Sequence, residues 1–395
     1  MEVGDATFPR GFWAYAWEGG PRLRMALLVS DRPATVAGRF TVNAAQAAPV
    51  QLCRRLVAGG VSQAAVINAG NANALTGAQG RADAERMQQL CGQALGIEPA
   101  TVAVASTGVI GVPLPMAEIE AGIHYLAERY QMGAPSEGEK AARAILTTDT
   151  RPKTGALTVS LSGGTVRIGY MAKGSGMIHP GMATMLVFLT TDAAVAPAVL
   201  DRLVGEAVDA SFHALSVDGD MSTNDTVLCW ANGASGVVVE QAEDVQAFGA
   251  ALTRLAQVAA RQIAADGEGA THLITARVRG AQTVADARQK ARAIIASALV
   301  KTAVYGRDPN WGRVLAAVGA SGLPWDPARA SLWMNGLCLY NQGVPLPFDE
   351  AEAKARMAAF EVVFEVALGE GEAEAEAWGC DLTEGYVDIN AHYRT

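Results

Sequence analysis

Cysteine is scarce in this 395-residue sequence, and its few copies form no recognisable pattern. The five cysteines are odd in number, lie far apart and include no CxxC pair, so they indicate neither a disulfide framework nor a zinc site. Asp218, Asp220 and Asp225 lack the ligand series and terminal Glu of a calcium-binding loop, so we predict no metal site, and we also expect no resident cofactor. We expect reduced, buried thiols at Cys53, Cys91, Cys229, Cys338 and Cys380.

Long apolar runs and blocks of one charge are also missing. No run approaches the length that crosses a bilayer, and the first ten residues, MEVGDATFPR, contain no apolar signal core, so we expect a cytoplasmic protein. The formal net charge of −9 is spread along the chain, which argues against nucleic acid or an anionic membrane as the main partner. Small molecules are the better candidates for substrates.

Hydrophobic residues make up half of the chain, and their spacing predicts strands that alternate with helices. Strict alternation near the C-terminus predicts strands of an antiparallel sheet, which the chain end completes. The alternating residues are Phe360, Val362, Phe364, Val366, Leu368, Ala375, Ala377, Val387 and Ile389. We predict an α/β protein with layered mixed sheets flanked by helices.

One stretch, residues 173–192, joins a flexible loop to a rigid element; it reads KGSGMIHPGMATMLVFLTTD. Glycines and Pro180 shape a sharp turn, and a continuous apolar run follows Thr184. An N-terminal Thr carries its own base, an α-amine with a pKa of roughly 7.7 to 8.0, and is therefore a competent nucleophile. Cutting the chain between Ala183 and Thr184 would create that amine. The alternative is an incidental Thr at the start of a buried strand.

The segment MAKGSGMIHPGMATMLVFLTTDA resembles the cleavage segment of the ornithine acetyltransferase (ArgJ) family, the self-cleaving glutamate N-acetyltransferases of arginine biosynthesis. The family's order of motifs recurs along nearly the whole chain. The resemblance implies the DmpA/ornithine acetyltransferase fold and autocatalytic cleavage between Ala183 and Thr184. It implies an α subunit of residues 1–183, a β subunit of residues 184–395, and a heterotetramer with two copies of each.

The same resemblance implies the reaction. Thr184 would take acetyl from N-acetylornithine and pass it to glutamate, which gives ornithine and N-acetylglutamate by ping-pong kinetics. The sequence leaves open whether acetyl-CoA also serves as a donor, and thus whether the enzyme is monofunctional or bifunctional.

Site residues are implied by matching motifs, although each motif also has an ordinary structural explanation as a turn, a helix cap, a surface lysine or a chain end. STGVIG supplies the implied oxyanion donors, Thr107 and Gly108. The implied substrate-binding residues are Thr148 in TTD, Lys173 in KGSGM, Thr184, Glu268 in EGAT, and Asn390 and Thr395 at the chain end.

Three features depart from the family or have no assigned role. His272 follows EGAT where the family usually has Lys, and the N-terminal stretch FWAYAWEGGPRLR is atypical. The segment YGRDPNWGR, residues 305–313, is explained as well by an Asp-Pro turn with Arg salt bridges, and its role stays open.

Two rival functions remain. An aminopeptidase-like hydrolase of the related fold would pass the acyl group to water, without dependence on glutamate. A paralogue that keeps the fold for binding or assembly would not be an enzyme, and it would run as one unbroken band in denaturing electrophoresis.

Overall fold

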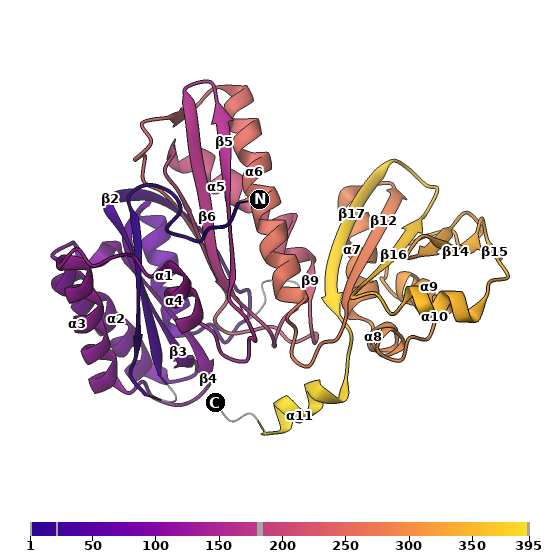
Figure 1. The fold of residues 1–395 in the computed structure, drawn as a ribbon, viewed down its shortest axis with the longest axis horizontal. Coiled ribbons are helices and arrows are strands. Elements are labelled where there is room, and N and C mark those ends of the chain that lie inside the picture. Colours follow the sequence, from indigo (N-terminus) through magenta and orange to yellow (C-terminus); the bar gives the residue numbers. More distant parts are fainter. Residues whose placement is uncertain (1, 21–22, 180–184, 393–395) are drawn as a thin grey trace.

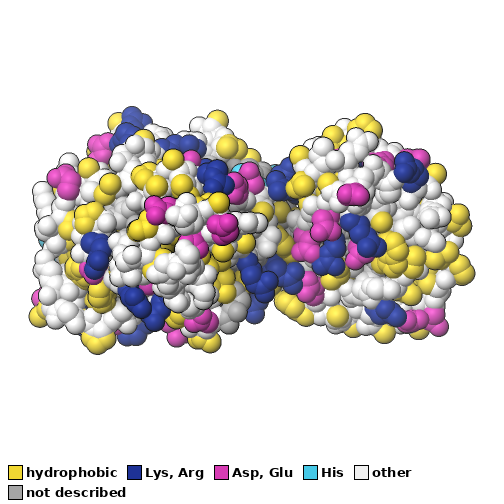
Figure 2. All heavy atoms as spheres, turned by 90° about the horizontal axis from the view of Figure 1, so that it is seen from above, with side chains coloured by type: hydrophobic (Ala, Val, Ile, Leu, Met, Phe, Trp, Pro, Cys, Tyr) yellow, Lys and Arg dark blue, Asp and Glu magenta, His cyan; other side chains and the backbone are white. Residues whose placement is uncertain are grey.

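The computed structural model of the chain describes residues 2–20, 23–179 and 185–392. It has two lobes, each built on a large sheet (Figure 1). Seen from above, the lobes join at a narrower middle, and side chains of both charges are interspersed over the face shown (Figure 2). Of the helices in the described ranges, none is long and apolar enough to cross a membrane.

The first lobe contains an eight-stranded mixed sheet in the order β4-β3-β2-β10-β7-β6-β5, with β1 paired to β2. The pairs β3/β4 and β7/β10 are parallel and the others antiparallel. The strands are β1 (Phe12–Glu18), β2 (Arg24–Phe40), β3 (Val61–Asn71), β4 (Val102–Val109), β5 (Lys153–Leu161), β6 (Gly164–Lys173), β7 (Leu186–Thr191) and β10 (Thr226–Ala231). A small parallel pair lies beside it, β8 (Ala194–Val195) with β11 (Val238–Val239).

Helices cover both faces of this sheet, and an apolar core fills each side. One face carries α1 (Ala48–Ala58), α2 (Gly77–Leu95), the short η1 (Pro99–Thr101), α3 (Met116–Gln131) and α4 (Gly138–Ala144). The other face carries α5 (Pro197–Asp209), followed by η2 (Phe212–Ala214), and α6 (Ala242–Ala264).

The second lobe contains a seven-stranded mixed sheet in the order β15-β14-β13-β16-β12-β17-β9. Its strands are β9 (Leu215–Ser216), β12 (Leu273–Ala281), β13 (Ser331–Met334), β14 (Leu337–Asn341), β15 (Val344–Pro345), β16 (Glu361–Ala367) and β17 (Ala373–Cys380). Its helices are α7 (Val284–Ala296), α8 (Ala298–Tyr305), α9 (Trp311–Gly319), α10 (Glu350–Arg356) and α11 (Glu384–His392). Layered mixed sheets flanked by helices are thus confirmed.

The prediction for the C-terminal sheet is partly wrong. β12 and β16 pair in parallel. The long connection between them, which includes α7 to α10, brings the chain back to the end of the sheet at which β12 began. Val387 and Ile389 lie in α11 and not in a strand. The chain leaves the sheet after β17, and the segment Glu384–His392 satisfies its backbone hydrogen bonds within a helix.

β7, the strand that begins two residues after Thr184, lies in the middle of the first sheet. β7 is buried along its whole length, as its apolar sequence predicts, and it stands between β6 and β10. Four of the five cysteines are buried, whereas Cys338 is partly exposed. Burial raises the pKa of the Cys53, Cys91 and Cys229 thiols to about 12, which leaves them unreactive.

Candidate active site

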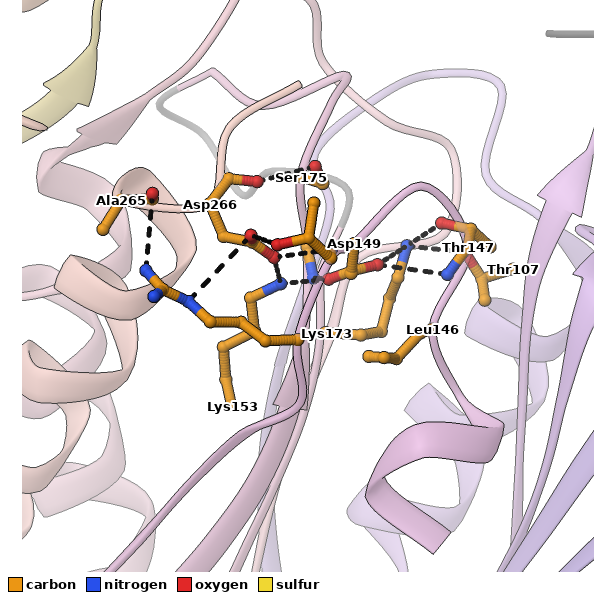
Figure 3. Close-up of polar contacts among 12 residues, drawn as sticks. Thr107, Leu146, Thr147, Asp149, Lys153, Lys173, Ser175, Ala265 and Asp266 are labelled. Atoms are coloured by element: carbon orange, nitrogen blue, oxygen red, sulfur yellow. Dashed lines mark hydrogen bonds and ion pairs between the residues drawn. The ribbon is translucent and has the colours of Figure 1, made fainter. Parts of the chain in front are cut away.

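A buried lysine at the end of β6 is the centre of the candidate site (Figure 3). The Lys173 side chain is 2% exposed, and its Nζ donates to Thr147 Oγ1 at 2.7 Å and to Thr107 Oγ1 at 3.3 Å. The Asp149 carboxylate lies 3.8 Å from the same nitrogen. Across the β6/β7 ladder Lys173 pairs with Leu186, two residues beyond the expected nucleophile. The site therefore lies beside the start of β7.

The end of β4 approaches this lysine in a conformation that needs glycine. Gly108 has a φ of 132°, and a Cβ there would collide with the backbone of Gly70 at the end of β3. An ammonium group can only donate, so Thr107 Oγ1 accepts from Lys173 and keeps its own proton for another acceptor. An oxyanion is stabilised by hydrogen-bond donors, and the Thr107 hydroxyl and the turned backbone at Gly108 can supply them.

A second buried lysine ties three segments together beneath the site (Figure 3). Lys153, at the start of β5, forms ion pairs with Asp149 and with Asp266 Oδ2, the latter at 2.5 Å. Thr150 donates to Asp266 from its amide and its hydroxyl. Burial alone would raise the pKa of Asp149, but the charges of Lys173 and Lys153 outweigh it and lower that pKa to about 2. Asp149 is therefore ionised and holds both lysines.

Glu268 reaches the same region from the loop after α6. Its amide donates to Ser175 O at 3.0 Å, and its carboxylate packs against Gly176, where a Cβ would collide with it. Asn390 Nδ2, from α11, donates to Glu268 Oε2 at 2.7 Å. Glu268 is 7% exposed. The Glu268 carboxylate thus packs directly on the glycine-rich turn that follows Lys173.

Burial and neighbouring carboxylates act on Lys173 in opposite directions. Burial lowers its pKa, and the charges of Asp149, Glu268 and Asp225 raise it again, with a net lowering. A cation and the Glu268 anion therefore lie within electrostatic range of each other in one largely buried site. Such a pair is complementary to an amino acid, which carries both charges.

The first described residue after the expected cut is held by a buried acid. Met185 donates its amide to Asp225 Oδ1 at 3.2 Å, and burial raises the pKa of Asp225 well above its ordinary value. Next to it, Asn224 Nδ2 donates to Ser106 O at 2.8 Å, directly before Thr107. These bonds connect the start of β7 to the end of β4.

Most of the predicted site residues that can be located come together. Thr107, Gly108, Lys173, Glu268 and Asn390 are joined by the contacts above, and Thr148 is half-buried in the turn between Thr147 and Asp149. Ala183, Thr184 and Thr395 lie outside the described residues. His272 is bound through Nδ1 to Asp381 at 2.9 Å. His179 Nδ1 lies 3.3 Å from Ser216 Oγ.

Sequence reasoning missed the buried charges that support the site, namely Asp149, Lys153, Asp225 and Asp266. The four-residue spacing of Asp149 and Lys153 was a weak signal, because such spacing indicates a pair only on a helix, and β5 begins at Lys153. Asp266 directly precedes the glycines that flank Glu268, but a helix end explained it equally well.

Comparison with known proteins identifies the family. Residues 15–395 match the ArgJ family. The chain is 51% identical to the arginine biosynthesis bifunctional protein ArgJ of Symbiobacterium thermophilum, over 100% of this chain and 99% of that one. It is 49% identical to the protein of that name from Thermus thermophilus, over 98% and 99% of the two chains. A solved structure of the Bacillus halodurans ArgJ protein matches with a TM-score of 0.50 and 39% identity, over 52% of this chain and 97% of that one. The resemblance seen in the sequence motifs is confirmed: this chain belongs to the ArgJ family.

Proposed function

We propose that this enzyme transfers acetyl from N-acetylornithine to glutamate through an acetyl-Thr184 intermediate, and so releases ornithine and N-acetylglutamate. The relatives that it matches along its whole length are named as arginine biosynthesis proteins. The reaction needs no resident cofactor, because the acetyl carbonyl carbon passes between amide, ester and thioester without a change of oxidation state. Acetyl-CoA is a further candidate donor.

The Lys173 to Thr107 hydrogen bond is the observation that carries this proposal. It orients the Thr107 hydroxyl so that its proton is available, beside the turned Gly108 backbone, at the place where the start of β7 meets the end of β4. An acyl group on Thr184 would have its carbonyl oxygen stabilised there as negative charge develops. Removal of one such donor typically slows turnover by about a hundredfold or more.

Self-cleavage comes first. The Thr184 hydroxyl attacks the Ala183 carbonyl, the peptide C–N bond breaks, and the nitrogen takes the hydroxyl proton. Water then hydrolyses the resulting ester, which leaves a carboxylate on Ala183 and a free amine and hydroxyl on Thr184. Residues 1–183 and 184–395 become two subunits. The solved Bacillus halodurans chain aligns over 97% of its length with 52% of this chain, which supports a division into pieces of similar length.

Acetyl transfer uses the amine that cleavage exposes. That amine takes the Thr184 hydroxyl proton, the oxygen attacks the acetyl carbonyl of N-acetylornithine, and the C–N bond breaks as ornithine leaves with the proton. Glutamate then attacks the ester with its own amine, and Thr184 regains its proton. Of the proposed substrate-binding residues, Lys173 would hold a carboxylate and Glu268 an ammonium, and Thr148, Asn390 and Thr395 would make further contacts to the substrate.

The proposed assembly contains two copies of each subunit, and the proposed location is the cytoplasm. The spread-out negative charge supports small-molecule substrates over nucleic acid or a membrane surface.

Thr184→Ala tests the proposal. The variant should show one band in denaturing electrophoresis, whereas the parent enzyme shows two, and it should lose acetyl transfer in an assay of N-acetylornithine with glutamate. Thr190→Ala, six residues further in the same segment, is the control and should still be cleaved. An active protein with an intact chain, or acetate release that does not depend on glutamate, would refute the proposed transferase.

A further inference from the structure

Asp225, the residue directly before β10, has a buried carboxyl group that is only half satisfied. The residue is 0% exposed. Its Oδ1 accepts a hydrogen bond from the Met185 amide at 3.2 Å, whereas Oδ2 makes no hydrogen bond to any residue that the structure describes. A buried polar atom without a partner costs about 1 to 3 kcal/mol, so an atom of this kind in a native core needs an explanation.

The surroundings of Asp225 favour its protonated form. Burial raises the pKa of this carboxyl group well above its ordinary value. The groups that act in the opposite direction, and do not offset burial, are the Met185 amide, the hydroxyls of Ser222 and Thr41, and the charge of Lys173. The Thr41 hydroxyl is already used, because it donates to Ser222 O at 2.7 Å. Asp225 therefore holds an acidic O–H proton away from water.

The hydrogen bond from Met185 places this acid close to the expected cut. Met185 is bonded directly to Thr184, so the backbone nitrogens of the two residues are at most about 3.7 Å apart. With the hydrogen bond of 3.2 Å, the covalent chain keeps the Thr184 nitrogen within about 7 Å of Asp225 Oδ1. The backbone of Asp225 is also fixed, because Thr41 N donates to Asp225 O at 3.1 Å. A proton donor is thus held beside the nitrogen that self-cleavage must release.

We propose that Asp225 is the proton donor for self-cleavage between Ala183 and Thr184; this inference rests on the Thr184 chemistry proposed above. As the Thr184 oxygen adds to the Ala183 carbonyl carbon and the C–N bond breaks, the Asp225 O–H proton passes to the Thr184 nitrogen. The proton of the Thr184 hydroxyl goes to the Asp225 carboxylate, so the acid is regenerated and no net charge is left in the buried site. An amide nitrogen leaves readily only when it gains a proton, which is the task of a general acid.

Asp225→Asn is the primary test. The amide matches the protonated acid in size and charge and can still accept from the Met185 amide, but it is not an acid. Pulse–chase labelling in cell-free translation, read by denaturing electrophoresis, follows cleavage of the new chain. Cleavage should slow by about a hundredfold or more, the usual size of a general-acid contribution. The midpoint of thermal unfolding should stay close to that of uncleaved Thr184→Ala.

Asp192→Asn is the matched control. Asp192 is equally buried, and it follows the other end of β7, where its carboxylate accepts from the Arg167 amide at 2.7 Å. The substitution removes a buried carboxylate from the same strand without touching the start of β7. This variant should be cleaved at the parent rate.

Hydroxylamine separates proton donation from the later hydrolysis, because it cleaves an ester at Thr184 and leaves a peptide bond intact. The Asp225→Asn chain should resist hydroxylamine, since no ester forms when the nitrogen gains no proton. The cleavage rate of the parent chain should also fall as the pH rises through the raised pKa of Asp225, because the carboxylate has no proton to give.

The inference is overturned if Asp225→Asn is cleaved at the parent rate, or if hydroxylamine cleaves this variant. Should Asp225→Asn fail to fold, the pH profile of the parent chain decides, and a cleavage rate that does not fall in alkaline buffer overturns the inference. A parent chain that is never cleaved would instead refute the proposed function.

Discussion

At the scale of single residues, the most informative contact is the one from Lys173 Nζ to Thr107 Oγ1. The lysine ammonium can only donate, so the Thr107 oxygen accepts from it and the Thr107 hydroxyl proton points towards another acceptor. The residue type at position 107 therefore matters less than the presence of a hydroxyl there.

Thr107→Ala should lower kcat by about a hundredfold or more while the KM for N-acetylornithine changes little, because the lost hydrogen bond forms in the transition state. Thr107→Ser keeps the hydroxyl and should keep most of the activity. Steady-state kinetics, normalised to cleaved protein because the same donor serves self-cleavage, measure both. Equal rates for the alanine and serine variants would rule out a donor role.

The pair of buried lysines makes stability depend on Asp149. Its pKa is about 2 in the folded chain and 3.8 ordinarily, so its ionised form stabilises the fold above pH 3.8, and that stabilisation is lost as the pH falls towards 2. Asp149→Asn should lower the free energy of unfolding at neutral pH by about 3 kcal/mol, because buried Lys173 and Lys153 both lose the Asp149 charge and Lys153 keeps only Asp266. Denaturant unfolding between pH 2 and 7 should show the two proteins converging in acid. A constant difference across that range would contradict this account.

At the scale of elements, α11 is the least expected part of the site. The sequence suggested a strand, but the helix packs its backbone on Gly269, which has a φ of 68°, and thereby places Asn390 on Glu268. The helix thus brings Asn390 from the far end of the chain onto Glu268, and the family resemblance implies substrate contacts for both residues.

Gly269→Ala should raise the KM for the amino-acid substrates by about tenfold, because the added methyl group collides with the Tyr386 amide and displaces α11 from Glu268. Gly133→Ala is the matched control, since Gly133 has nearly the same φ, 66°, but nothing within 4 Å of an added Cβ. Kinetics and thermal unfolding of both variants separate the collision from simple backbone strain. A similar KM in the two variants would count against the role of α11.

At the scale of the whole molecule, the expected cut does not separate two folding units. β7 and β10 come from the later piece, yet they lie between β2 and β6 of the earlier piece in one continuous sheet. The pieces 1–183 and 184–395 share backbone ladders on both sides of β7 and β10, and common cores on both faces of the sheet. Cleavage between Ala183 and Thr184 would break one peptide bond and leave these contacts in place.

The cleaved protein should therefore elute as one species in native size-exclusion chromatography and separate into two bands under denaturing conditions. Separation of the pieces would expose the edges of β2, β6, β7 and β10 and their buried apolar faces, at a large cost in free energy. Unfolding of the cleaved protein in increasing urea should show both pieces unfolding in one transition. Elution of the two pieces as separate folded proteins would refute this arrangement.

The sequence by itself determined the local features of this protein. Apolar periodicity located β7, α5 and α6, and short motifs that resemble those of the family marked Thr107, Lys173 and Glu268 as candidates, because these signals lie within a few neighbouring residues. Tertiary structure alone decided which charges are buried together and how the C-terminal segment folds. Lys153 and Asp266 are 113 residues apart, and Asn390 and Glu268 are 122 apart, so no local pattern records these pairs. Val387 and Ile389 alternate like a strand but lie in a helix whose backbone packs on Gly269, more than 100 residues earlier in the chain, and no pattern of two alternating residues records that contact.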